Sequence, residues 1–319
     1  MHSKTIILNP TLKGILFVAF GASSYGMLAT FVKIAYDQGF TTAEVTTSQY
    51  VFAILCLLFL NAITKKSQAI ASSTDLKKLI LSGTSMGFTS VLYYLSVKYV
   101  NASIAVVLLM QSVWIGVFVE AYLNKQKPSK AKIIAVLFVL FGTALATNIL
   151  DNELVFNFKG YLFGFLAAIS FSMTLYSTNS VAKHLHAYKR SLFMLFGGGM
   201  IVLTFTLLTQ ILPTYFQIHL IGSEFITIKS FDFSILYTWG ILLSLFGTVL
   251  PPILLNKGFP LVGVGLGSIV SALELPVSVT FAFFLLKEQV LGIQWLGILI
   301  ILAAVILINL NLLKKTKEI

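Results

Sequence analysis

One acidic residue stands alone in a long apolar run near the end of the chain. Glu274 lies near the middle of the run Phe259–Leu286. A charged side chain at that depth in a bilayer costs at least about 2.5 kcal/mol, so it faces a cavity, pairs with a base or is neutralised by a proton. Proton coupling and contact with a cationic group of a ligand are the two functional interpretations. A packing glutamate that is hydrogen-bonded to a neighbouring helix is the structural alternative.

Prolines interrupt the apolar runs in the same part of the chain. Pro251, Pro252 and Pro276 each lack a backbone N–H, so a helical carbonyl four residues earlier loses its usual partner. For Pro276 that carbonyl belongs to Ala272, within one turn of Glu274. Broken helices mark ligand sites in many transporters. We therefore predict hinges at the three prolines, with a static kink that improves packing as the alternative.

Polar side chains in other apolar runs are candidate ligand contacts. Gln111 aligns with Glu274 at an offset of 163 residues, and Trp114, one turn later, would give a cavity an aromatic wall. Hydroxyl, phenol and amide groups complete the predicted set: Ser24, Tyr25, Gln49, Tyr94, Ser170, Tyr176 and Asn179. An interhelix hydrogen bond is the alternative role for each of them. Together they predict a moderately polar cavity.

These residues are carried by a chain whose composition excludes a soluble fold. Of its 319 residues, 57% are hydrophobic and 10% are charged, against about 25% charged in soluble domains. A helix needs about 20 apolar residues to cross a bilayer. Ten runs of suitable length lie between the charges: Gly14–Val32, Val45–Thr64, Leu79–Val97, Tyr99–Val119, Ile133–Leu150, Gly160–Ala182, Ser191–Leu212, Phe233–Asn256, Phe259–Leu286 and Val290–Leu313. We therefore predict an all-α membrane protein with ten transmembrane helices.

The distribution of Lys and Arg predicts the orientation. With ten spans, both termini and the loop segments 65–78, 125–132 and 183–190 lie on one side, together with Lys257. That side holds all but five of the 22 basic residues. Short cytoplasmic loops are enriched in Lys and Arg. We expect a multi-pass protein of the bacterial inner membrane with both termini in the cytoplasm, and we interpret the net charge of +11 as a topology signal and not as a nucleic-acid footprint.

The chain also repeats itself after five spans. Lys13-Gly14 matches Lys159-Gly160 at an offset of 146 residues, and Gln126 matches Gln289 at an offset of 163. Because five is odd, the second copy enters the membrane from the opposite side. We predict two inverted five-helix repeats, residues 1–150 and 151–319, an architecture found in many secondary transporters.

Three stretches resemble the drug/metabolite transporter superfamily in its ten-helix EamA-type form. Leu273-Glu274-Leu275-Pro276 with Phe284-Leu285-Leu286-Lys287-Glu288 is similar to the Glu/Pro helix and acidic turn of that family, Leu296–Ile300 resembles its last helix, and Lys13–Lys33 resembles its first. The first repeat departs from the pattern, since it has no proline near Val113 and has Asn124-Lys125 at the turn. The resemblance implies export of small metabolites such as amino acids or amphiphilic compounds.

Signals for catalysis are missing from the sequence. No glycine-rich phosphate loop or nucleophile elbow is present, and His184 and His186 have no Cys or acid at metal-ligand spacing. We expect no enzyme activity, metal or cofactor. The predicted function is a secondary transporter that works by alternating access on a small molecule in the lipid bilayer, with proton coupling at Glu274. The alternative is a membrane-embedded non-transport protein, either a lipid-acting enzyme or an assembly subunit. The sequence gives no prediction of oligomeric state.

Overall fold

Helices are the regular elements of the chain. The computed structural model describes residues 9–64, 71–100, 102–146, 157–287 and 290–317, and no strand occurs among them. The longer helices are α1 (Pro10–Asp37), α2 (Thr42–Ile63), α3 (Ser73–Tyr99), α4 (Ala102–Leu109), α5 (Ser112–Leu123), α6 (Lys130–Ala146), α7 (Phe158–Ser180), α8 (Ala187–Thr206), α11 (Leu250–Val262), α12 (Val264–Ser271), α13 (Glu274–Leu285) and α14 (Gly292–Lys317). Shorter segments are η2 (Leu207–Ile211), α9 (Leu212–Phe216), η3 (Ser223–Phe225), η4 (Leu236–Gly240), α10 (Ile241–Ser244) and η5 (Leu245–Val249). The all-α prediction is confirmed.

Side-chain caps fix where several helices begin. Thr41 accepts a hydrogen bond from the N–H of Glu44 at 3.1 Å, and the Glu44 carboxylate accepts one from the N–H of Thr41 at 2.8 Å. Ser72 and Asp75 form the same capping box at the start of α3. Each box satisfies backbone donors that have no partner inside the helix.

Seven helical stretches within the described residues are long and apolar enough to cross a membrane. They are Pro10–Asp37, Thr42–Ile63, Ala105–Leu123, Phe158–Ser180, Ala187–Phe216, Leu236–Val262 and Val264–Leu285. A shorter apolar stretch, Gly292–Leu307, lies in α14. Helices α3 and α6 occupy the other two predicted spans. The presence of several apolar spans is confirmed, and the count of ten stays a prediction.

The later helices of the two halves correspond in length and spacing. α4 and α12 have eight residues each, and α5 and α13 have twelve each. The bounds of α12 and α13, and the start of α14, lie 162 residues after those of α4, α5 and α6. This offset makes Ser112 the counterpart of Glu274, so the predicted match of Gln111 to Glu274 is wrong by one residue. The offset of 163 relied on Gln126, which follows α5 in a connection, where insertions are tolerated, and on Gln289, which lies outside the described residues.

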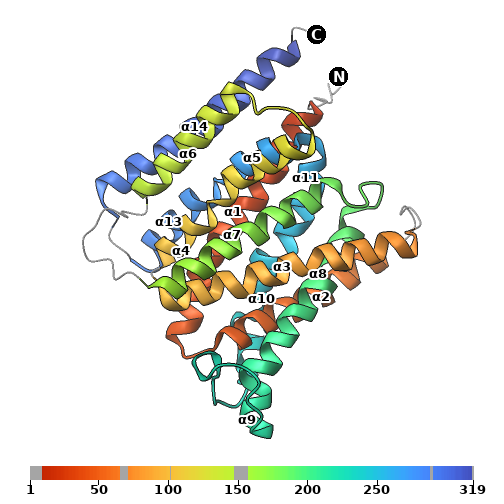
Figure 1. Cartoon of the computed structure of the whole chain (residues 1–319), viewed down its shortest axis with the longest axis vertical. Coiled ribbons are helices and arrows are strands. Elements are labelled where there is room, and N and C mark those ends of the chain that lie inside the picture. The colour runs from red at the N-terminus through yellow and green to blue at the C-terminus, as the bar shows by residue number, and fades with distance from the viewer. Residues whose placement is uncertain (1–8, 65–70, 101, 147–156, 288–289, 318–319) are drawn as a thin grey trace, which may run out of the picture.

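Helix contacts repeat in the same way between the halves. α7, the first helix of the second half, packs on α3, and α1 packs on α11 in the corresponding manner. The pairs α2 with α8, α5 with α12, and α6 with α14 join one half to the other. α6 and α14 run side by side at the edge of the molecule, and the start of α1 and the end of α14 lie at the same end (Figure 1). This arrangement fits an inverted repeat.

Lys257, which was predicted to lie in the connection between the eighth and ninth spans, lies in a helix instead. Lys257 is inside α11, which continues to Val262, so the predicted boundary between the eighth and ninth spans is wrong. The ammonium of Lys257 lies 5.7 Å and 5.1 Å from the ring centroids of Phe17 and Tyr188, contacts that stabilise a cation within a helix. The true boundary is Gly263, whose φ of 79° suits glycine and ends the helix.

Candidate functional site

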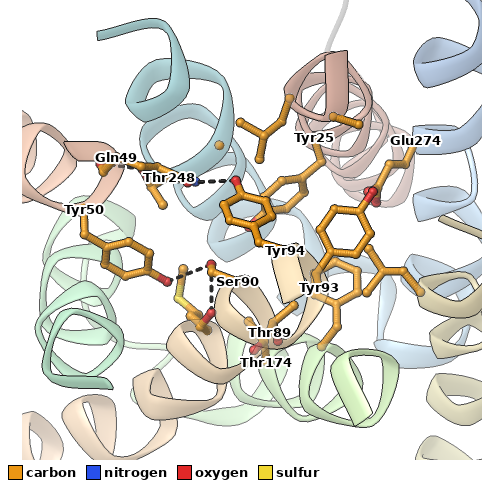
Figure 2. Close-up of a pocket in the computed structure, with 16 residues that line it drawn as sticks. Tyr25, Gln49, Tyr50, Thr89, Ser90, Tyr93, Tyr94, Thr174, Thr248 and Glu274 are labelled. Carbon is orange, nitrogen blue, oxygen red and sulfur yellow. Dashed lines mark hydrogen bonds between the residues drawn. The ribbon is translucent and has the colours of Figure 1, made fainter. Parts of the chain in front are cut away.

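A cavity of about 50 Å³ lies where helices of both halves meet, and we call it the central cavity (Figure 2). Its walls come from α1, α2, α3, α4, α7, η5 and α13. The lining residues are Tyr25, Leu28, Ala29, Gln49, Tyr50, Met86, Thr89, Ser90, Tyr93, Tyr94, Leu109, Phe171, Thr174, Gly247, Thr248 and Glu274. A cavity of about 150 Å³ holds a benzene ring, so this one must widen to admit a ligand larger than a few waters.

Glu274 enters the central cavity at the interruption between α12 and α13. It is the first residue of α13 and is 6% exposed. Its Oε2 atom is buried without a hydrogen-bond partner among the described residues. Gly26 of α1 packs directly on this turn, since a Cβ there would clash with the carbonyl oxygen of Glu274 and lie 2.9 Å from Cβ of Val277. Close contact with α1 therefore holds Glu274 in place.

The backbone around Pro276 differs from the expectation. The carbonyl of Ala272 was predicted to lack a partner, but it accepts a hydrogen bond from the N–H of Leu275 at 3.2 Å. The N–H of Leu273 likewise bonds to Val270 at 3.1 Å, three residues earlier. The chain tightens into a turn of 3₁₀ type and so satisfies the carbonyl that proline releases. The carboxylate is left as the open polar group of this turn.

Hydrogen bonds between helices fix the polar groups on the side of the cavity away from Glu274. The phenol of Tyr94 donates to Oε1 of Gln49 at 2.8 Å, and Thr248 of η5 donates to the Gln49 carbonyl at 3.1 Å. The hydroxyls of Tyr50 and Ser90 lie 3.2 Å apart. Figure 2 shows these groups opposite Glu274. These hydrogen bonds link α2 to α3 and to η5 along this wall.

Aromatic rings surround the end of the cavity that holds Glu274. Tyr25 and Tyr93 lie near the carboxylate (Figure 2). Tyr25 packs edge to face on Phe171 with ring centroids 5.8 Å apart, and the centroids of Tyr93 and Tyr94 are 5.9 Å apart. The cavity thus combines one acid with a largely aromatic wall.

Four of the predicted site residues line the central cavity: Tyr25, Gln49, Tyr94 and Glu274. Two others serve as contacts between helices. Ser24 donates to the carbonyl of Phe246 at 2.9 Å, and Ser170 donates to that of Ser85 at 2.8 Å. Both bonds support the cavity walls from behind.

The remaining predicted residues lie away from the cavity. Trp114 donates to Oε1 of Gln111 at 2.9 Å, and Gln111 donates to the carbonyl of Val107 at 3.1 Å. Trp114 lines a separate apolar recess between α5 and α6. Tyr176 and Asn179 are half-buried on α7 and do not line the cavity.

The sequence prediction missed Met86, Thr89 and Ser90 on one face of α3. Met86, Thr89, Ser90 and Tyr93 all line the cavity, and their spacing of three and four residues places them on one helix face. This spacing was available in the sequence as a signal. Thr174 and Thr248 were also missed, and neither stands out from other helix threonines by position alone.

Prolines 251 and 252 occupy the first turn of α11, directly after the π-helical segment η5. The first turn of a helix has no need of the N–H groups that proline lacks. In η5 the N–H of Leu250 reaches back to the carbonyl of Leu245. The irregular part of this helix is therefore the wide turn that carries Gly247 and Thr248 into the cavity.

A network of hydrogen bonds surrounds Glu44, a residue that was predicted to lie in a loop. Glu44 is fully buried. Its carboxylate accepts hydrogen bonds from the N–H of Thr41, from Nε2 of Gln210 at 2.9 Å and from the N–H of Asp232 at 2.8 Å. The ammonium of Lys229 lies 3.6 Å away. These bonds fasten the segment after α9 to the start of α2.

The segment that reaches Glu44 has further polar anchors. Lys229 donates to the carbonyl of Gly39 at 2.9 Å. Hydrogen bonding by the side chain and backbone of Ser234, with Lys229 nearby, lowers the pKa of the Asp232 carboxyl. Charged groups of this segment are thus held close to the α1–α2 turn.

A second network surrounds Arg190, which was also predicted in a loop. It lies in the first turn of α8 and is 1% exposed. Its guanidinium donates to the carbonyls of Thr178, of Val181 at 3.0 Å and of Asn256 at 2.8 Å. The side chain therefore ties the end of α7 and the middle of α11 to α8.

Metal binding finds no support in the described residues, where no group of three or more His, Cys, Asp or Glu side chains is placed to hold an ion. His184 lies 3.4 Å from a carboxylate oxygen of Asp75. His186 caps the start of α8.

Comparison with known proteins gives a family and a fold. The model of the EamA-like transporter family matches residues 12–148 and again residues 158–310. No curated protein matches. A solved structure described as "Crystal structure of protein" is similar over 95% of this chain and 98% of its own, with 13% identity and a TM-score of 0.68. That similarity concerns the fold alone.

Proposed function

Because the chain belongs to the EamA-like transporter family, we propose that it is a secondary transporter that moves small organic molecules across a membrane by alternating access. The observation that carries the proposal is the central cavity, to which both repeats contribute walls and in which a carboxylate is buried. Rocking of two repeats around such a site opens it to each side in turn.

We propose that ten helical stretches cross the membrane, with both termini in the cytoplasm of a bacterium. α3 is polar for a spanning helix, but Ser85 and Ser96 in it are hydrogen-bonded to α7. The hydroxyl of Ser85 lies 2.7 Å from that of Thr174, and Ser96 donates to the carbonyl of Gly160 at 2.8 Å. Phe20 and Leu81, by contrast, are 66% and 73% exposed, as suits contact with lipid. The distribution of Lys and Arg supports the orientation.

We propose that the cargo is a small metabolite, such as an amino acid or an amphiphilic compound, and that it is exported in exchange for protons. The mixture of phenol, hydroxyl and amide groups in the cavity supports an amphiphilic cargo. Glu274 is the group that would take up the proton. The halves 1–150 and 151–319 would move against each other, with Pro251, Pro252 and Pro276 as hinges.

Exchange by purified protein in liposomes tests the transport function. Liposomes loaded with a defined mixture of amino acids, amines and other metabolites would be diluted into isotope-labelled copies of the same mixture. We expect at least one labelled compound to enter by exchange. Ala29→Trp, which fills the cavity, should abolish the exchange while its circular dichroism stays helical. A folded protein that exchanges no compound would instead support a membrane-embedded non-transport role.

A further inference from the structure

We propose that the central cavity selects a small organic monocation, an amine or quaternary ammonium carried on an aromatic or aliphatic body, and holds its charge beside Glu274. The proposal rests on the transport function proposed above and names the substrate class of the same site. It narrows the cargo from metabolites in general to cations without a carboxylate.

The charge of the cavity carries the first step. Among the 16 residues that line it, Glu274 is the one acid, and none is Lys, Arg or His. Its Oε2 atom is buried and has no partner among the described residues. A buried carboxylate needs a positive charge or a proton nearby. Since no side chain of the lining supplies that charge, a cationic ligand supplies it in the loaded cavity and a proton in the empty one.

The second step comes from the rings around the carboxylate. Tyr25 and Tyr93 lie at the same end of the cavity as Glu274 (Figure 2), and Phe171 packs against Tyr25. Aromatic side chains attract ammonium groups through their ring faces, and cages of such rings are used to bind quaternary ammonium ligands. An acid together with several rings therefore fits a cation better than any neutral ligand.

The rest of the cavity determines what the cation is attached to. The far wall presents Gln49, Tyr50 and Ser90, whose polar atoms bond to one another or to Tyr94. No basic side chain lines the cavity, so a carboxylate on the ligand would find no positive partner there. An amine should therefore bind in preference to the amino acid that differs from it only by a carboxylate.

Binding of matched pairs to the full-length protein tests the proposal. Tyramine against tyrosine, and phenethylamine against phenylalanine, would be measured by calorimetry on protein in lipid nanodiscs, with choline as a quaternary probe. We expect at least one of the three cations to bind, and each amine that binds to do so at least about tenfold more tightly than its amino acid, the size of one charge-assisted contact. Glu274→Gln should weaken cation binding by about tenfold or more, and Glu274→Asp should retain part of it.

Glu224→Gln is the control, because Glu224 is an acid about half exposed in η3 and pairs with Lys159 at 2.7 Å, away from the cavity. It should bind as the unmodified chain does. Tighter binding of the amino acids, unchanged cation binding in folded Glu274→Gln, or no binding of any cation would each overturn the proposal. Exchange of other metabolites in the liposome assay would leave the transport function intact in those cases, so the two failures are distinguishable.

Discussion

Glu44 and Glu274 are both buried acids, but the protein treats them differently. Glu44 accepts hydrogen bonds from three donors and has Lys229 3.6 Å away. Glu274 has an oxygen with no partner among the described residues, in a cavity between helices of both halves. An acid whose oxygens are satisfied by its own chain stabilises the fold. An acid left open in a cavity is available to a ligand or a proton.

The same substitution at each acid separates these roles, and the effect on stability should be largest at Glu44. Glu44→Gln places an amide NH₂ among backbone and amide donors and removes the charge that faces Lys229. We expect the free energy of unfolding to fall by about 2–3 kcal/mol, because charge-assisted hydrogen bonds are lost and a buried donor is left unpaired. Reversible unfolding in detergent would measure it. Unchanged stability would show that this network holds nothing together.

A methyl group on Gly26 should have the next largest effect on stability. Gly26→Ala pushes a Cβ against the carbonyl oxygen of Glu274, and overpacking of this kind costs about 1–3 kcal/mol. Since α1 and α13 must then separate, transport should fall together with the melting temperature. Gly39→Ala is not a matched control, because Gly39 has a φ of 87°. Gly292→Ala is better suited, since a Cβ there meets no neighbour within 4 Å. Equal melting temperatures for the two variants would contradict the close contact.

Glu274→Gln should change the free energy of unfolding less than Glu44→Gln does. It replaces a buried carboxylate that lacks a full set of partners by a neutral side chain of the same shape, so the free energy of unfolding should stay within about 1 kcal/mol or rise. Transport should nevertheless fall about tenfold or more. Parallel measurement of melting and of exchange in liposomes checks this. A large loss of stability would place Glu274 with Glu44 as a structural acid.

Lys229→Ala should have the smallest effect. Lys229 is 38% exposed, and its ammonium is 3.6 Å from Glu44, so solvent screens the pair. We expect a loss of about 0.5–1 kcal/mol, as for other partly exposed ion pairs, because the three hydrogen bonds to Glu44 remain. Melting curves would show it. A loss as large as that of Glu44→Gln would mean that the ion pair, and not the hydrogen bonds, stabilises this end.

Local signals in the sequence were enough to find part of the site. Glu274 was recognised because a charge inside an apolar run has few structural explanations. Tyr25, Gln49 and Tyr94 were found because they are polar groups in predicted spans. Gln111 was aligned with Glu274 through an offset one residue too long. One residue turns a helix by about 100°, which is enough to move a side chain off the face in question.

Partners that are distant in the sequence could not be predicted. Gln210, 166 positions away, bonds to Glu44. Arg190 and Asn256 are 66 positions apart and meet only because their helices pack together. Both charged residues were therefore assigned to loops, where charges at the ends of apolar runs usually lie. The helix break at Met110-Gln111 was also missed, because no proline or glycine indicates it. The break at Ala272-Leu273 lies within four residues of Pro276, where a hinge was predicted.

Labelling with a hydrophobic carbodiimide tests the difference between the two acids most directly. The reagent couples to buried protonated carboxyl groups, and peptide mass spectrometry of one sample measures Glu274 and Glu44 together. We predict that Glu274 is labelled, that at least one of tyramine, phenethylamine and choline protects it, and that Glu44 stays unlabelled with or without these cations. Equal labelling of both acids, or labelling of Glu274 that none of the three cations changes, would contradict the assignment of Glu274 as the open ligand site.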